Sequence, residues 1–510
     1  MCAVNRIILN TGITYLRTSF AAIVGLFTAR WVLLSLGEDA YGLYGLVGSI
    51  LVFITFLNNV LAGAVSRYFA YSIGQKNSEV LNTWFNAAIR IHVFVPLILL
   101  AAGSVLGLFA IRYWLNIDSN DVNVAIKVFY VSLTASTVTM MTAPFKGLLL
   151  AKQDIAQQSV IEILQSFAHL LLMYILLTKV RNNQLIIYAL MMASETIIFQ
   201  LLIASRAVTL YGEIKIIRYP WYKLKSYVNE LLAFSGWKSL MGFGQIAYNQ
   251  GLAVILNVFF GTRMNASYSI ASNLSAQSST VSNSLMMAIT PEIITRKGAG
   301  MHENMKSLSL KACRYSSYLV ILIALPLFLD VDNILTMWLK DPPQYTDVLC
   351  RFILVSLFID KIASGQESAV NACGKIKWFQ ISIALSYVVS VLSAYILLCV
   401  FRNPMVVGWS FLICSILNTF IRLYFGQSIA DVKIKDWSVH VFVPLFASVL
   451  PVAVLSYMLM SLMPSEGFTR LVLIVMSTSV LFLITGWIFI LDSTLKIKIL
   501  NRIFKKNENS

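Results

Sequence analysis

The sequence predicts an all-α, polytopic membrane protein with about fourteen transmembrane helices. The first observation behind this prediction is composition: 58% of the 510 residues are hydrophobic and 12% are charged, and the mean hydropathy is +0.76. A soluble domain has roughly 45–50% apolar and about 25% charged residues. The second is that the apolar residues form continuous runs, long enough to cross a bilayer as helices. Continuous rather than alternating runs exclude a transmembrane barrel.

The predicted spans follow one another with short loops between them. They cover residues 10–35, 42–72, 85–112, 122–149, 155–179, 184–209, 231–260, 264–294, 308–331, 347–372, 377–401, 405–430, 439–462 and 468–491. Alternate loops are rich in Lys and Arg, and the opposite loops carry acids such as Glu38 and Asp39. The positive-inside rule then predicts that both termini lie in the cytoplasm. We expect a multi-pass protein of a bacterial inner membrane.

A stretch at residues 219–229 interleaves aromatic residues with lysines, which is typical of an interfacial helix. It lies in the middle of the chain, between two halves that correspond at an offset of 224 residues. Gly37 corresponds to Gly261 and Asn59 to Asn283 in this register. Because the offset contains six spans, the halves share their orientation, as in transporters built from parallel repeats. The predicted parts are an N-terminal lobe of residues 1–215, a C-terminal lobe of 216–430, two further spans in 431–495 and a basic cytoplasmic tail at 496–510.

The remaining sequence features exclude several functional classes. The net charge of +16 is spread between apolar segments, so we expect contact with anionic lipids and no nucleic-acid partner. The six cysteines and four histidines show no metal-binding spacing. There is no phosphate-binding loop or hydrolase motif, so we expect no enzyme and no cofactor.

Polar residues at membrane depth are costly and by default face a bundle interior or a wet cavity. Residues 265–283 are polar around most of a helix, which favours a water-filled cavity, although tight helix packing through small residues is the alternative. A cavity lined by cations would suit an anionic cargo. The predicted cationic and polar lining consists of Arg17, Arg30, Arg67, Lys127, Lys238, Gln245, Asn249, Asn273, Gln277 and Asn283.

Asp360 and Glu367 share one face of a predicted helix, with Lys361 and Arg351 nearby. Two interpretations stay open: a site coupled to an H⁺ or Na⁺ gradient, or an internal salt bridge that locks the lobe. Glu162 with His169, and Glu195, are weaker candidates of the same kind.

Three segments resemble the polysaccharide transporter (O-antigen flippase) family of the multidrug/oligosaccharidyl-lipid/polysaccharide exporter superfamily. They are residues 37–45 (GEDAYGLYG), 62–68 (AGAVSRY) and 144–155 (PFKGLLLAKQDI). This family often has an acid just before the glycine of the second helix, where the present sequence has Asn58 and Asn59.

The resemblance implies two six-helix lobes with alternating access that move an undecaprenyl-diphosphate-linked oligosaccharide outward. It also implies a polysaccharide polymerase and a chain-length regulator as partners. The last two spans, almost uncharged, would form a groove for a lipid tail or simply pack against one lobe. The alternatives are a cation-coupled multidrug exporter of the same superfamily, and a membrane scaffold that transports nothing.

Overall fold

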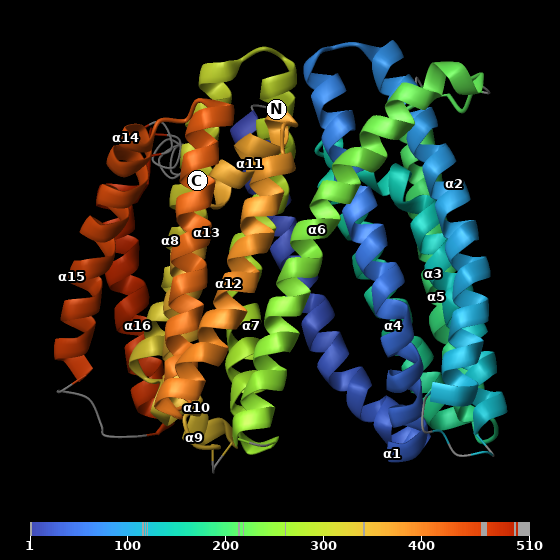
Figure 1. Cartoon of the computed structure of the whole chain (residues 1–510), viewed down its shortest axis with the longest axis horizontal. Coiled ribbons are helices and arrows are strands. Elements are labelled where there is room, and N and C mark those ends of the chain that lie inside the picture. Colours follow the sequence, from blue (N-terminus) through green and yellow to red (C-terminus); the bar gives the residue numbers. More distant parts are fainter. Residues whose placement is uncertain are drawn as a thin grey trace, which may run out of the picture. The chain divides into compact units, whose positions relative to one another are not determined.

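The computed structural model describes residues 3–114, 117, 119, 121–212, 215–217, 219–260, 262–339, 342–460, 467–493 and 496–497, and for some residues in helices only the backbone. Every regular element in these ranges is a helix, which confirms the all-α prediction (Figure 1). Each predicted span is helical over most of its length, although 347–372 is divided by a break at Ile362 and Ala363, and the last two residues of 439–462 lie outside the described ranges. Nine helical segments among the described residues are long and apolar enough to cross a membrane. The predicted tail is described only at Lys496 and Ile497.

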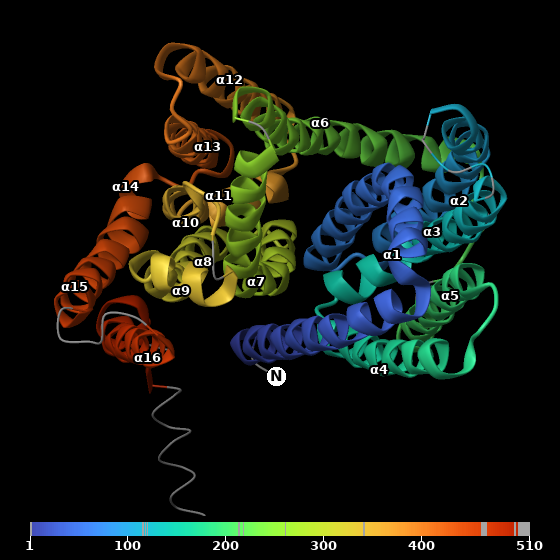
Figure 2. The same ribbon diagram turned by 90° about the horizontal axis from the view of Figure 1, so that it is seen from below.

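Contacts divide the chain into two units, the first comprising residues up to Ser239 with Ile294–Met301 and the second Leu240–Ile293 with the residues from His302 onward. The helices of the first unit are α1 (Ala3–Gly74), α2 (Ser78–Phe109, continued by a π-helical turn Ala110–Trp114), α3 (Val122–Ala151), α4 (Ile155–Lys179) and α5 (Gln184–Leu210). Among them, α3 packs against α1, α2 and α5 (Figure 2). Phe129, Leu133 and Leu51 lie in their apolar core.

Two predicted spans, 10–35 and 42–72, lie in α1 on either side of a kink at Gly37. Its φ of 77° and ψ of 172° belong to the left-handed half of the backbone map, which glycine adopts without a steric penalty. The chain therefore turns there without a separate loop.

In the second unit α13 packs against α10, α11 and α12. Its helices are the later part of α6 (Trp221–Phe260), most of α7 (Thr262–Gly298), α8 (His302–Leu329), α9 (Val331–Leu339), α10 (Thr346–Lys361), α11 (Ser364–Cys373), α12 (Lys377–Phe401), α13 (Val406–Ala430), α14 (Ile434–Trp437, continued by a π-helical turn Ser438–Phe442), α15 (Val443–Met460) and α16 (Phe468–Thr485, continued by a π-helical turn Gly486–Ile490).

The helix boundaries confirm the repeat. The kink at Gly37 lies within α1, and at an offset of 224 residues the chain passes from the end of α6 at Phe260 to the start of α7 at Thr262. With the same offset, Gly74 at the end of α1 corresponds to Gly298 at the end of α7. The starts of α2 and α3 likewise correspond to the starts of α8 and α10.

The sequence predicts a separate interfacial helix at 219–229, but in the structure this stretch is continuous with the following span. From Trp221 onward this stretch is the first part of α6, which is helical without a break to Phe260. The boundary between the two contact units lies within this helix, after Ser239. The predicted boundary between the lobes, at residues 215 and 216, divides the two sequence repeats and not the two contact units. It stays a prediction.

The last two spans belong to the second unit and pack against its helix α8. Helices α15 and α16 contact each other and α8 (Figure 1). Arg470, at the start of α16, places Nε 2.7 Å from Oδ1 of the buried Asp330. At the other end, Asp492 Oδ2 lies 2.8 Å from Nζ of Lys311 on α8. Ion pairs thus fix both ends of α16, in agreement with simple packing against one lobe.

Candidate functional site

The second unit contains a cavity of about 910 Å³. Its walls come from α6, α7, α10, α11, α12 and α13. Apolar side chains are a minority in the lining. The polar lining residues are Gln245, Tyr248, Asn249, Gln250, Tyr268, Ser272, Asn273, Ser275, Ser356, Asp360, Lys361, Glu367, Tyr387, Ser415, Asn418 and Arg422.

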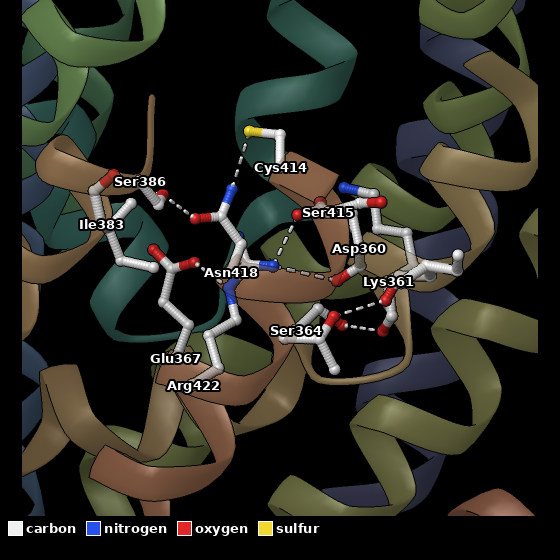
Figure 3. A network of polar contacts seen from close by, with 12 residues as sticks. Asp360, Lys361, Ser364, Glu367, Ile383, Ser386, Cys414, Ser415, Asn418 and Arg422 are labelled. Carbon is white, nitrogen blue, oxygen red and sulfur yellow. Dashed lines mark hydrogen bonds and ion pairs between the residues drawn. The ribbon is translucent and has the colours of Figure 1, made fainter. Parts of the chain in front are cut away.

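Arg422 of α13 joins the two carboxylates that the sequence singled out (Figure 3). Its Nη1 lies 2.5 Å from Asp360 Oδ1, and its Nε lies 3.3 Å from Glu367 Oε2. The side chain of Arg422 is 8% exposed, whereas those of Asp360 and Glu367 are 31% and 22% exposed to the cavity side. The arrangement matches the salt-bridge interpretation, with a partner that sequence spacing did not indicate.

The predicted continuous helix through Asp360 and Glu367 is wrong, because the chain leaves the helix at Ile362 and Ala363, between α10 and α11. A break of this kind frees backbone carbonyls that need new donors. Arg422 Nη1 donates to the carbonyl of Asp360 at 3.0 Å, and the indole of Trp437 donates to the carbonyl of Ile362 at 2.9 Å. Arg422 therefore stabilises both the carboxylates and the break.

The expected partners Lys361 and Arg351 have other contacts. Lys361 Nζ donates to Oδ1 of Asn283 on α7 at 3.0 Å. Arg351 binds Asp332 at 2.6 Å and Asp347 at 3.3 Å, near the other end of α10.

Three tyrosines line the same cavity. The rings of Tyr248 and Tyr387 lie 5.5 Å apart, and Tyr268 stacks with Phe411 at 6.0 Å. The hydroxyl of Tyr268 donates to the carbonyl of Asn249 at 3.3 Å. The lining therefore combines aromatic rings with amides and hydroxyls.

Of the polar residues predicted on α6 and α7, the cavity brings together Gln245, Asn249 and Asn273. Gln277 and Asn283 are exposed farther along α7. Their assignment to a cargo path stays a prediction.

The first unit contains a cavity of about 610 Å³ between α1, α3, α4 and α5. Here Arg17 of α1 forms an ion pair with Glu162 of α4, the side chains being 19% and 17% exposed. Lys146 Nζ and Gln158 Nε2 donate to the other oxygen of Glu162, at 2.8 and 2.9 Å. Arg17 is therefore not a lone cation in this cavity.

A second pair lies in the same lining. His169 Nδ1 is 3.0 Å from Oε2 of Glu195, a carboxylate whose side chain is only 5% exposed. His169 thus meets Glu195, and not Glu162, seven residues earlier on its own helix.

The other predicted cations lie in different surroundings. Arg67 is buried, with its guanidinium carbon 4.6 Å from the ring centre of Tyr68 and 4.8 Å from that of Phe234. Lys127 is exposed on α3, and Lys238 is half-buried on α6. For Arg30 only the backbone, in α1, is described.

The described linings hold balanced charges rather than the expected excess of cations. Arg17 and Lys146 face Glu162 and Glu195 in the first cavity. In the second cavity two cations face two carboxylates in the same way. No group of three His, Cys, Asp or Glu that could hold a metal ion occurs in the described part of the chain.

Similar folds occur among transporters of known structure. No protein-family model and no curated protein matches the sequence. A crystal structure of MATE in the bent conformation superposes with a TM-score of 0.71 at 15% identity, covering 86% of this chain and 98% of that one. An outward-facing multidrug resistance MATE family transporter of the MOP superfamily gives 0.69 at 18% identity, covering 84% and 95%.

A third similar structure is a MOP superfamily transporter from Pyrococcus furiosus, with a TM-score of 0.67 at 16% identity, covering 84% of this chain and 95% of that one. Identities this low establish the fold and not the cargo. The chain adopts the polytopic, all-helical fold of the MATE transporters of the MOP superfamily.

Proposed function

We propose that this protein is a flippase that moves an undecaprenyl-diphosphate-linked oligosaccharide from the cytoplasmic to the outer leaflet of a bacterial inner membrane by alternating access. The observation that carries the proposal is the lining of the cavity in the second unit. Amides, hydroxyls and tyrosine rings dominate it, and its charges balance.

This lining suits a saccharide. Sugar hydroxyls both donate and accept hydrogen bonds, and amide side chains such as Asn249 and Asn273 offer both functions. Tyrosine presents an apolar ring face together with a polar hydroxyl. At about 910 Å³, the cavity lies in the range of small-molecule sites, roughly 300–1,000 Å³.

The first unit offers groups for the diphosphate. Arg17 and Lys146 present a guanidinium and an ammonium to one cavity. Arginine forks match phosphate oxygens, and lysine binds them as a point charge. A cation at membrane depth is a candidate for the substrate path by default.

The start of α6 supports contact with membrane lipids. Trp221 and Tyr222 are 54% and 77% exposed, and Lys223 and Lys225 are exposed beside them. Aromatic rings at headgroup depth with basic residues beside them bind anionic lipid surfaces. A polysaccharide polymerase and a chain-length regulator complete the proposed set of partners.

Asp360 and Glu367 are the proposed coupling residues for an H⁺ or Na⁺ gradient. Both reach the cavity and share Arg422. A proton or a cation on one carboxylate would weaken its ion pair with Arg422. Such a change would favour a different packing of α10, α11 and α13.

A cation-coupled multidrug exporter is the second candidate, and the carboxylates in both cavities favour it. One similar structure is described as a multidrug resistance transporter, and for the Pyrococcus furiosus protein a reversed pocket polarity is said to suggest a different function. This fold therefore accommodates pockets of different polarity. A membrane scaffold without transport would not need the polar linings.

Site-specific photocrosslinking tests the proposal. A photoreactive residue at Asn273 should label a radioactive lipid-linked oligosaccharide in isolated membranes. The control is the same residue at Trp378, which is 65% exposed on the outside of α12. Equal labelling at the two positions, or labelling of Asn273 by a cationic drug analogue alone, would contradict the proposal.

A further inference from the structure

Glu162 holds the cations that the proposed function assigns to phosphate. One carboxylate oxygen binds Arg17, and the other accepts hydrogen bonds from Lys146 and Gln158 at 2.8 and 2.9 Å. The donors come from α1, α3 and α4 itself. A guanidinium, an ammonium and an amide around one anion form the kind of donor set that a phosphate group requires.

We propose that Glu162 is an internal counter-anion, which the phosphate of the cargo displaces from Arg17 and Lys146. This inference rests on the proposed function, because it takes the cargo to be a phosphate ester. It adds a role for a carboxylate that would otherwise oppose an anionic cargo.

Without cargo, the two cations need a compensating charge. Arg17 is 19% exposed and Lys146 40%, and a cation at membrane depth is costly unless it is paired. Glu162 supplies one negative charge within contact of both, so the cavity is stable when no cargo is present. The cavity of about 610 Å³ beside the pair leaves room for a phosphate to approach and for the glutamate side chain to rotate away.

When a phosphate is bound to Arg17 and Lys146, contact of the Glu162 carboxylate with the same cations is unfavourable. A phosphate and a carboxylate on the same cations repel each other, and juxtaposed like charges cost several kcal/mol. Glu162 therefore lowers the affinity for cargo and promotes its release, because it returns to the cations as the phosphate leaves. Tight binding would instead trap the cargo.

The second acidic residue of the cavity provides a matched control. Glu195 carries the same charge in the same lining, but its contact is His169 at 3.0 Å. Neutralising Glu195 changes the net charge of the cavity as much as neutralising Glu162 does. Only Glu162 competes directly for Arg17 and Lys146.

Titration calorimetry with pyrophosphate, on protein in lipid nanodiscs, tests the inference. Glu162→Gln should bind pyrophosphate at least about tenfold more tightly than the wild type, and Glu195→Gln should change the affinity far less. Glu162→Asp keeps the charge on a shorter side chain and should fall between wild type and Glu162→Gln. It serves as the readout should Glu162→Gln not fold.

Two results would overturn the inference while leaving the phosphate site intact. One is binding that Arg17→Gln abolishes but Glu162→Gln does not tighten, and the other is equal tightening by Glu162→Gln and Glu195→Gln. Wild-type binding that Arg17→Gln leaves unchanged, or no binding by any variant, would contradict the phosphate site of the proposed function itself.

Discussion

Arg422 Nη1 lies 2.5 Å from Asp360 Oδ1, in a contact that joins α13 to the end of α10 beside the larger cavity. The two residues are 62 positions apart in the sequence. Because Arg422 also reaches Glu367 and the backbone at the break between α10 and α11, it connects three helices.

Removal of this guanidinium should be strongly destabilising. Arg422→Gln leaves two carboxylates without their cation, and breaking a buried pair costs roughly 3–5 kcal/mol. Arg351→Gln is the control, because its side chain is 32% exposed and pairs at the surface, where a pair contributes about 0–1 kcal/mol. Thermal unfolding in detergent should show a large loss of stability for the first variant only. Equal losses would contradict the central role of Arg422.

The segment before α6 should be released by two asparagine substitutions on α2. The amides of Lys215 and Ile217 donate to Oδ1 of Asn82 and Asn86 at 3.0 and 2.8 Å. Because Ala offers no acceptor, the double variant Asn82→Ala, Asn86→Ala should speed hydrogen exchange at these two amides. Asn77→Ala, which removes the N-cap of α2 instead, is the control. Unchanged exchange in the double variant would refute the role of the asparagines.

We predict that position 74 must be glycine, because the backbone there lies very close to the backbone of Thr295. A Cβ on Gly74 would collide with the carbonyl oxygen of Thr295, whereas a Cβ on Gly63 meets nothing within 4 Å. Gly74→Ala should therefore destabilise the protein by about 1–3 kcal/mol. Gly63→Ala in the same helix should be neutral or stabilising by up to about 1 kcal/mol. Thermal unfolding of the two variants is the measurement, and similar unfolding curves would contradict the contact.

Acid should weaken the attachment of α16 through Asp492. Burial raises the pKa of this carboxyl. The hydrogen bonds from Lys311 and Arg314 lower the pKa by more than burial raises it, so the pKa lies below its ordinary value. The folded-state pKa is thus below the unfolded one, which is about 3.9. The stability from Asp492 is then present above about pH 3.9 and is lost as the pH falls through the folded value.

Comparison of wild type with Asp492→Asn across pH measures this contribution. The variant should be less stable at pH 7, and the difference should shrink below about pH 4. A difference that does not change with pH would show that the charge of Asp492 contributes nothing.

Much of the fold could be predicted because apolar run length and repetition are local properties of the sequence. The spans needed only runs of about 20 apolar residues. The repeat needed only a constant offset, and the helix ends at Gly74 and Gly298 follow it. The continuity of α6 could not be predicted, because aromatic residues and lysines at 219–225 fit an interfacial helix and the start of a longer one equally well.

The site was predicted only in part, because its ion pairs join distant segments. Spacing along one helix identified Asp360 and Glu367, yet it could not indicate Arg422 on another helix. Arg17 was recognised as a cation at membrane depth, but its pairing with Glu162 depends on how α1 packs against α4. The position of Asn273 at a cavity could be predicted because residues 265–283 are polar around most of a helix, and polar residues at membrane depth face away from lipid.

Transport in reconstituted liposomes tests the central claim most directly. Purified protein is incorporated into vesicles that contain a labelled undecaprenyl-diphosphate-linked oligosaccharide, and a membrane-impermeant glycosidase reports how much saccharide crosses the bilayer. We predict that wild-type protein accelerates crossing and that Arg17→Gln, with the protein still folded, loses most of this acceleration. A wild-type protein that leaves the saccharide in place but expels a cationic dye under an ion gradient would contradict the account.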